Sequence, residues 1–540
     1  MPQENKFIKN VCYLSFILTS ICLIPWAMNF FSYAINVDIA FLTLSAERMI
    51  EGEKMSESFY DTNPPLSIIL QIPAVLISNY LSVPLYYATT TYTLILLFLS
   101  IASTHLLLRR FEGLKVEEHT IILCVFLFLN TMKLDYDFGQ KDHILGMALF
   151  PLTLAQILIT KRVDFNFWLK LSVLLIGGTL ILLKPHYGVI PLVIFIHRAV
   201  SQKRLTVIFD VDFICLAICF SSYISLIFLA FPDFISIILP SIFQYYASDI
   251  SPHVYMLGVQ LIIQFVIPAI LCAVLFKNGH SLITCLSLMA AICVIPIILQ
   301  GKGWAYHAIP AEIFFYSSVS ILAVHLIERS FILLKEEKLS RYGALIIPVM
   351  LLLFVVSTKY ENTPSIPTHD SYKNTELAQT IKACGSDCSF LIMHDMINMS
   401  PELSVYTSSR HASRFPTFWF IPSFLNIQNN LNSGQESSMT QTELDQEVLK
   451  YTNMIAEDFS KNDPDIVFVG LFPNFFDNGQ PFNFYDYLLS KNPNAFEPIF
   501  NQYALDQSIK IDRIEYMPQK KPNEGLMQYN IYRKKKSSAE

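Results

Sequence analysis

Long uninterrupted apolar stretches constrain this chain more than any other feature. An α-helix needs about 20 apolar residues to cross a bilayer, and eleven stretches approach or reach that length. Their predicted bounds are 11–31, 85–108, 119–134, 143–160, 167–183, 187–200, 208–231, 254–276, 281–300, 308–327 and 343–357. A hydrophobic content of 53%, with 15% charged residues and a mean hydropathy of +0.43, excludes a soluble protein of 540 residues. The sequence predicts a polytopic α-helical membrane protein.

Two apolar segments differ from ordinary spans. Residues 11–31 follow Lys6 and Lys9 and are longer than a signal-peptide core, which predicts an uncleaved anchor, although residues 32–34 weakly match a cleavage site. Residues 65–83 contain or adjoin four prolines and lack a basic flank. They predict a re-entrant or interfacial segment that does not cross the membrane.

The basic clusters at the ends of the predicted spans fall on one side of this topology. They are Lys6, Lys9, Arg109, Arg110, Lys115, Lys161, Arg162, Arg198, Lys203, Arg204, Lys277, Arg329, Lys335, Lys338 and Arg341. Because cytoplasmic loops carry the excess of basic residues, the N-terminus is predicted to lie in the cytoplasm and the C-terminus outside. If residues 65–83 crossed the membrane, every later cluster would invert. The loops 32–84, 135–142, 184–187, 232–253 and 301–307 then face outward.

The chain is predicted to have two domains. Residues 1–357 form a transmembrane module that includes the first outward loop, 32–84, and residues 358–540 form a soluble extracytoplasmic α/β domain. In this tail the patterns predict helices, strands and a terminal hairpin. The predicted helices are 376–383 and 445–460, the strands 390–393 and 466–470, and the hairpin 509–533. In an oxidising compartment Cys384 and Cys388 are predicted to form a local disulfide.

Three outward loops repeat a pattern of lysine, histidine and aromatic residues. Interfacial solvation, snorkelling lysines or an aromatic belt would explain each loop singly. Their presence on one face predicts instead a cavity that binds a phosphate and a flat, hydroxyl-rich group, because cations and helix N-termini attract anions. The net charge of −6 gives no basic footprint for nucleic acid. The residues assigned to phosphate binding are Lys141, His143, Lys184, His186, Lys302, Tyr306 and His307.

Two acidic residues stand out on the same predicted face. Asp38 lies directly beyond the first span, where a partly desolvated carboxylate can act as a base. A helix N-cap is the alternative interpretation. Asp142 lies in the next outward loop, beside Lys141 and His143.

Other polar residues carry weaker signals. His394, Asp395 and His411 in the tail could bind a metal, but close third and fourth ligands are missing. Asp210 and Asp212 begin a span on the predicted cytoplasmic side, where they are expected to sit at the membrane interface. No metal site is assigned.

The order and common sidedness of four short motifs resemble the type C integral membrane glycosyltransferases. This superfamily includes lipid A aminoarabinose transferases, protein O-mannosyltransferases and oligosaccharyltransferases. The matching features are Asp38 after the first span, the Pro64-Pro65-Leu66 turn, Asp142, and the aromatic-His-x-x-Pro stretch formed by Tyr306, His307 and Pro310. The resemblance covers about residues 11–330.

The resemblance implies a chemistry. Asp38 would activate an acceptor hydroxyl, a polyprenyl-phosphate sugar would be the donor, and Asp142 would orient the sugar or a loop cation. The reaction would be inverting, at the outer face of a bacterial inner membrane, on a glycolipid, polysaccharide or protein acceptor of the cell envelope. A secondary transporter and a non-catalytic envelope-assembly scaffold are the alternatives.

Two departures from the superfamily pattern bear on this. Some relatives have Lys or His before the Pro-Pro pair, where Asn63 stands here. Others carry an acidic pair in the first loop and bind a divalent metal, whereas Ile39 follows Asp38. A divalent metal as cofactor is therefore left open.

Overall fold

The chain folds into two compact units in the computed structural model. The structure describes residues 16–17, 19–21, 24–25, 27–246, 258–275, 281–302, 304–333, 367–394, 399–472, 482–512 and 526–535. The first, here called the helical unit, comprises Met1–Phe31, Thr89–Ala230 and Ile250–Thr363. The second, the mixed unit, comprises Ser32–Ala88, Phe231–Asp249 and Pro364–Glu540. Each unit is thus assembled from separate stretches of sequence.

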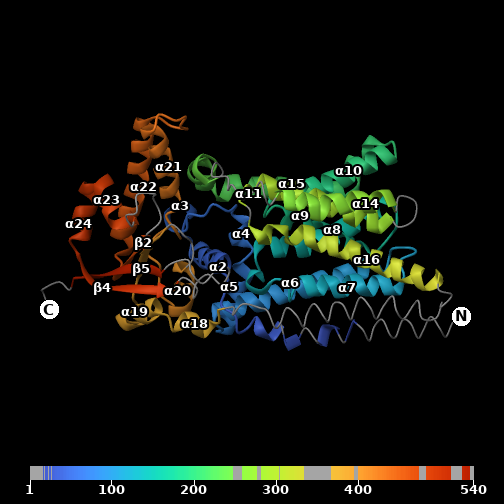
Figure 1. The fold of residues 1–540 in the computed structure, drawn as a ribbon, viewed down its shortest axis with the longest axis horizontal. Helices are drawn as coiled ribbons and strands as arrows, with labels where there is room; N and C mark the ends of the chain where they lie inside the picture. The colour runs from blue at the N-terminus through green and yellow to red at the C-terminus, as the bar shows by residue number, and fades with distance from the viewer. Residues whose placement is uncertain are drawn as a thin grey trace. The chain divides into compact units, whose positions relative to one another are not determined.

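The helical unit is built from apolar helices, most of which lie side by side (Figure 1). Within the described ranges, five stretches are long and apolar enough to cross a membrane. They are Leu85–Leu108, Lys141–Thr160, Val211–Ala230, Leu282–Leu299 and Ala305–Ile327. They match the predicted spans 85–108, 143–160, 208–231, 281–300 and 308–327. The chain is a multi-pass membrane protein.

The bounds of the helices in this unit follow the predicted spans, with some shorter. They are α6 Leu85–Leu108, α7 Val116–Leu129, α8 Lys141–Thr160, α9 Phe167–Ile181, α10 Val189–Ser201, α11 Val211–Ala230, α14 Ile267–Leu275, α15 Ser281–Leu299 and α16 Ile309–Leu333. Helix α7 ends before residue 134 because the Asn130 side chain turns back to the Phe126 carbonyl, at 2.7 Å. The predicted span 343–357, and parts of 11–31 and 254–276, lie outside the described residues, so the count of eleven and the orientation stay predictions.

Helix α8 is the centre of the helical unit. It packs against α9, α10 and α16, and almost all of its side chains are buried, as expected for a helix that is apolar all round. Glycines allow its neighbours to approach closely. A Cβ added at Gly177 of α9 would lie 2.9 Å from the Cβ of Leu152 on α8.

The charged residues at the start of α11 are paired inside the unit. Asp212 is fully buried and forms a two-pronged ion pair with Arg198 at 2.6 and 2.8 Å. The location of Asp210 and Asp212 at the membrane interface stays a prediction. Arg198 comes from the last turn of α10 and is 1% exposed. A buried charge is tolerated when it is paired in this way.

The mixed unit contains a five-stranded sheet with the order β1-β2-β5-β4, and β3 pairs with β2. Strands β1 and β2 are parallel, and the other pairs are antiparallel. The strands are β1 Phe390–Met393, β2 Ile466–Phe472, β3 Phe482–Asn483, β4 Tyr503–Asp512 and β5 Leu526–Lys534. These confirm the predicted strands 390–393 and 466–470 and the predicted hairpin 509–533.

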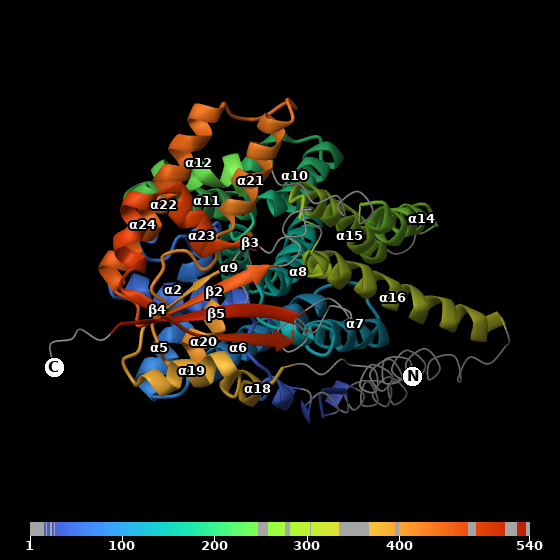
Figure 2. The same ribbon diagram turned by 60° about the vertical axis from the view of Figure 1, so that its left-hand side comes forward.

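Helices cover both faces of this sheet (Figure 2). The helices of the tail are α18 His369–Lys373, α19 Glu376–Cys384, α20 Ser400–Thr407, α21 Phe420–Asn432, α22 Gln441–Asn462, α23 Phe484–Lys491 and α24 Pro493–Phe500. They confirm the helices predicted at 376–383 and 445–460. Every residue of β1 is buried. On one face Phe390, Ile392 and Phe468 join a core with residues of α18, α19 and α20.

The first loop folds with the tail in this unit. It forms α2 Val37–Ile50, α3 Met55–Ser58, α4 Leu66–Ile69 and α5 Ile72–Leu81, and α2 packs against α20. The segment predicted not to cross, 65–83, consists of the two short helices α4 and α5. Helix α5 exposes Leu76, Tyr80 and Leu81.

Arg414 ties the segments of the mixed unit together. It is 7% exposed and donates to Asp458 of α22 at 2.8 Å and to the Ser56 carbonyl of α3 at 3.1 Å. The Ser56 amide in turn donates to Asp233, from the loop at 231–249, at 2.8 Å. A π-helix at Phe234–Ile238, α12 at Leu239–Ser241 and a π-helix at Ile242–Tyr246 complete this loop. The predicted domain boundary near residue 358 lies outside the described residues.

Candidate functional site

The helical unit brings together two of the predicted outward loops and the end of the predicted span 281–300 at one ion pair. The Lys184 ammonium donates to both oxygens of Asp142, at 2.8 and 2.7 Å, and to the Gln300 side-chain oxygen at 2.6 Å. Asp142 is fully buried and the Lys184 side chain is 12% exposed. The three side chains are therefore held in one geometry.

Helix ends place these groups. Asp142 lies in the first turn of α8, where the helix dipole favours a carboxylate. Lys184 precedes a 3-10 helix at Pro185–Gly188, which begins at the proline and links α9 to α10. Gln300 follows the last residue of α15. The polar groups thus gather where apolar helices stop.

The predicted outward loops supply aromatic and histidine neighbours. The Tyr306 ring centre lies 5.9 Å from the Lys184 nitrogen, in cation–π range. The Tyr187 hydroxyl donates to the His307 carbonyl at 3.1 Å, which joins the loop after α9 to the loop after α15. His307 is 4% exposed and its Nδ1 atom has no hydrogen-bond partner within the described part of the chain.

Lysines supply the positive charge of this site, and His186 adds none. Burial, followed by the nearby Lys184 charge, lowers the pKa of His186 to about 4. The neutral ring at physiological pH can donate or accept a hydrogen bond but adds no charge. The buried Lys141 and the half-buried Lys302 are the other two cations of these loops.

His143 has a structural partner. Its Nδ1 atom accepts from the Gly139 amide at 3.0 Å, and Gly139 has a positive φ of 89°. This contact fixes the turn that leads into α8.

Asp38 belongs to the mixed unit, in the first turn of α2. The helix N-cap is Asn36, whose side chain accepts from the Asp38 amide at 3.0 Å. The alternative reading of Asp38 as an N-cap is therefore wrong, and its half-buried carboxylate is not needed for that purpose.

A second carboxyl group accompanies Asp38. Glu402 of α20 is fully buried, and Asp38 is among the charges that raise its pKa. Tyr406 lies on the same helix as Glu402, and its hydroxyl accepts from the Ile35 amide at 2.7 Å and contacts the His369 Nδ1 at 2.9 Å. Sequence reasoning missed Glu402, and Gln300 as well, because a single polar residue in a tail or at the end of an apolar run gives no signal.

Asn63 has a role in the turn before the Pro-Pro pair. Its amide and side-chain nitrogens donate to Asp61 at 3.0 and 2.8 Å. This Asx-type turn leads to Pro65, the N-cap of α4.

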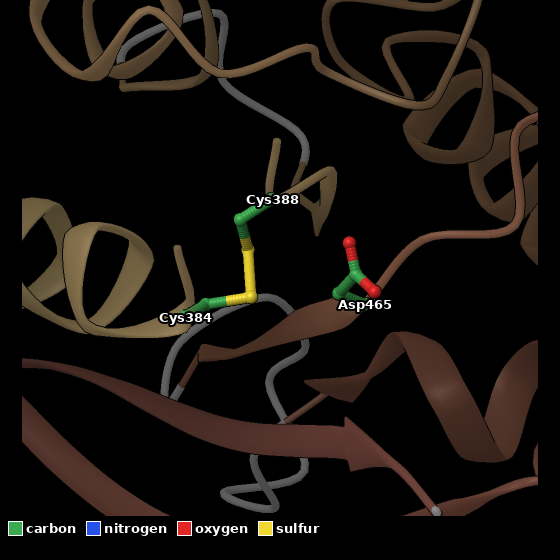
Figure 3. A group of neighbouring side chains, drawn as sticks. All are labelled: Cys384, Cys388 and Asp465. Carbon is green, nitrogen blue, oxygen red and sulfur yellow. A yellow bond between two sulfur atoms is a disulfide. The ribbon is translucent and has the colours of Figure 1, made fainter. Parts of the chain in front are cut away.

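Cys384 and Cys388 form the predicted disulfide (Figure 3). With Asp465 they make up the one cluster of potential metal ligands found among the described residues, with donor atoms within 4.8 Å of one another. Thiolates rather than disulfide sulfurs bind metals, and Asp465 accepts from the Ser389 amide and hydroxyl at 2.8 and 3.1 Å. The cluster thus fastens the start of β1.

The tail histidines do not form a ligand set with each other. His411 is buried, its Nε2 accepts from the Ile392 amide at 3.3 Å, and burial lowers its pKa to about 3. The His394 ring stacks on Tyr529, 5.9 Å between centroids. Asp395 lies outside the described residues.

Comparisons with known proteins give similarity at the level of structure. No family model and no curated protein sequence matches the chain. The crystal structure of ArnT from Cupriavidus metallidurans bound to undecaprenyl phosphate is 11% identical, covers 75% of this chain and 84% of its own, and has a TM-score of 0.43. The apo structure is 12% identical, covers 73% and 84%, and has a TM-score of 0.45.

Proposed function

We propose that the chain is a glycosyltransferase that moves a sugar from a polyprenyl-phosphate donor to an envelope acceptor at the outer face of a bacterial inner membrane. The convergence of two loops and the end of α15 on Lys184, Asp142 and Gln300 carries this proposal. A lysine fixed at the ends of apolar helices suits a phosphate whose lipid chain remains in the membrane. The acceptor is a glycolipid, a polysaccharide or a protein.

An apolar cavity supports a lipid-linked donor. It has a volume of about 100 Å³ and is lined by residues of α6, α8 and α9, from Ile144 to Pro151 on α8 and from Ser172 to Leu180 on α9. Ile144 and Leu180 lie close in sequence to Asp142 and Lys184. A phosphate bound at Lys184 would therefore have an apolar path for the first isoprene units of its chain.

The cations would act on the leaving group. As the bond between the anomeric carbon and the phosphate oxygen breaks, negative charge grows on the polyprenyl phosphate. Lys184, Lys141 and Lys302 offset that charge, and Tyr306, His143, His186 and His307 would complete the phosphate site. Asp142 holds the Lys184 ammonium in place.

Asp38 is the proposed base. It takes the proton of the acceptor hydroxyl while the acceptor oxygen bonds to the anomeric carbon and polyprenyl phosphate departs, which inverts the configuration at that carbon. General-base assistance is worth about 10²- to 10⁴-fold in rate. The half-buried position of Asp38 suits this role.

The one-sided charge pattern and the composition of the mixed unit support the proposed sidedness. Loops 32–88 and 231–249 and the tail from residue 364 belong to one compact unit. Segments of one folded unit lie on one side of a membrane, and the basic clusters of the sequence put the opposite side in the cytoplasm. The proposed extracytoplasmic part then consists of the tail, whose predicted start is residue 358, together with loops 32–88 and 231–249.

A secondary transporter is the weaker candidate. Transporters place ionisable residues near the bilayer midplane on broken helices. Here Lys184 precedes α10 and Arg198 lies in its last turn, so the two charged clusters are separated by the length of that helix. Neither lies midway along it.

Sugar transfer by the purified chain tests the proposal. With a synthetic polyprenyl-phosphate sugar and membrane extract as acceptor, the wild-type chain should release polyprenyl phosphate and Asp38→Asn should lose about 10²-fold or more in turnover. Asp486→Asn is the matched control, since Asp486 also lies in the first turn of a helix of the mixed unit. Equal turnover of wild type and Asp38→Asn would shift the base to another residue.

Lys302→Ala tests the donor site without breaking the Lys184 ion pair. The loss of one cation should weaken donor binding while the chain stays folded. Unchanged donor affinity would remove Lys302 from the phosphate site, and absence of any transfer would favour a scaffold or transporter.

A further inference from the structure

Glu402 is a buried acid whose position the proposed reaction does not yet use. It is the third residue of α20, which packs against α2, the helix of Asp38. Its side chain is fully buried, and one carboxyl oxygen accepts from the Met399 amide at 2.9 Å. The second oxygen, Oε1, is also buried and has no hydrogen-bond partner within the described residues.

This environment opposes a negative charge on Glu402. A buried carboxylate needs hydrogen bonds or a cation to replace water. The titratable groups that interact with it are Asp38 from α2, Tyr372 from α18 and Tyr406 from its own helix. Burial raises the pKa of Glu402 to about 8, the backbone amides of Glu402 and Met399 lower it, and the Asp38 charge raises it.

We infer that Glu402 is a positioning residue for Asp38: a carboxyl group that stays protonated at neutral pH, so that Asp38 is the single negative charge of a coupled pair. The inference rests on the proposed role of Asp38 as base. Because the two groups interact, proton uptake by one changes the proton affinity of the other. Deprotonation of Glu402 would place a second negative charge beside Asp38 and raise the proton affinity of the base.

Infrared spectroscopy of the whole chain in lipid nanodiscs tests the coupling without substrates. The wild type should show a protonated-carboxyl band that disappears as pH rises through about 8. Glu402→Gln keeps the size of the side chain and an oxygen that accepts from Met399, and it should remove this transition. Asp38→Asn removes the neighbouring charge and should move the same transition to lower pH.

Glu47→Gln is the matched control. Glu47 is a second carboxyl of α2 whose pKa is raised, to about 7, first by burial and then by Glu51. Its replacement should remove an earlier transition and leave that of Glu402 in place. If Glu402→Gln fails to fold, Asp38→Asn alone still measures the coupling.

Two results would overturn the inference: a transition near pH 8 that survives Glu402→Gln, or one that Asp38→Asn does not move. Where sugar transfer is measurable, its rate should change as pH passes 8 in the wild type and should not do so in Glu402→Gln. A chain with no transfer activity would refute the proposed function and leave the infrared result standing, so the two failures are distinct.

Discussion

The ion pair between Lys184 and Asp142 allows a stabilising role to be separated from a phosphate-binding role. At 2.7 Å two unit charges in a medium of effective dielectric constant near 20 attract by about 6 kcal/mol, before desolvation is subtracted. Lys184→Met leaves the Asp142 carboxylate fully buried without its cation. We expect this to cost about 3–5 kcal/mol of folding free energy, the usual result of breaking a buried pair.

The double variant should behave differently. Asp142→Asn combined with Lys184→Met removes both charges, so most of the lost stability should return, and the coupling energy should reach a few kcal/mol. Thermal denaturation in lipid nanodiscs of the wild type, Lys184→Met, Asp142→Asn and the double variant would measure the coupling energy. Lys450→Met is the control, because the Lys450–Glu447 pair is exposed and should be worth at most about 1 kcal/mol.

Donor binding supplies the second readout of the same variants. If Lys184 binds the donor phosphate, the double variant should be stable and yet bind a polyprenyl phosphate poorly. A double variant as unstable as Lys184→Met would refute the view that the pair compensates the buried charge. A stable double variant with normal donor affinity would place the phosphate elsewhere.

Four further measurements test the stability, the disulfide and the topology of the chain. Arg414→Met should destabilise the mixed unit by about 3–5 kcal/mol, because Asp458 is fully buried and loses its cation; denaturation measures it. Thiol labelling of Cys384 and Cys388 should require reductant. Above pH 8, Glu402→Gln should have a larger free energy of unfolding than the wild type. Because the pKa of Glu402 is raised from 4.5 to about 8, the stability that the neutral acid contributes is complete below pH 4.5 and is lost as the pH rises to about 8. This loss amounts to up to about 5 kcal/mol in the wild type. A reporter active only in the cytoplasm, fused after residue 357, should be silent.

Much of the site could be expected from the sequence because its residues are polar interruptions of apolar runs. Asp142, Lys184 and the loop at 301–307 stand out against long helices, and the order of the helices limits where they can meet. The pairing itself was not visible, since the sequence does not say which side chain a lysine contacts. Gln300 was missed for this reason, and the pairing of Asp212 with Arg198 was not expected because Arg198 lies on another helix.

Local chemistry determined the strands, helix starts and disulfide of the tail, because alternation of apolar residues, capping residues and short loops act within a few residues of each other. Apolar length determined that the chain enters a membrane. Tertiary structure alone decided that residues 32–88 and 231–249 fold with the tail, since Arg414 and α20 draw together segments that are hundreds of residues apart. It also decided that Glu402 lies buried on α20, the helix that packs against the helix of Asp38. Burial and the resulting proton affinity depend on which helices pack together, and no local pattern encodes that.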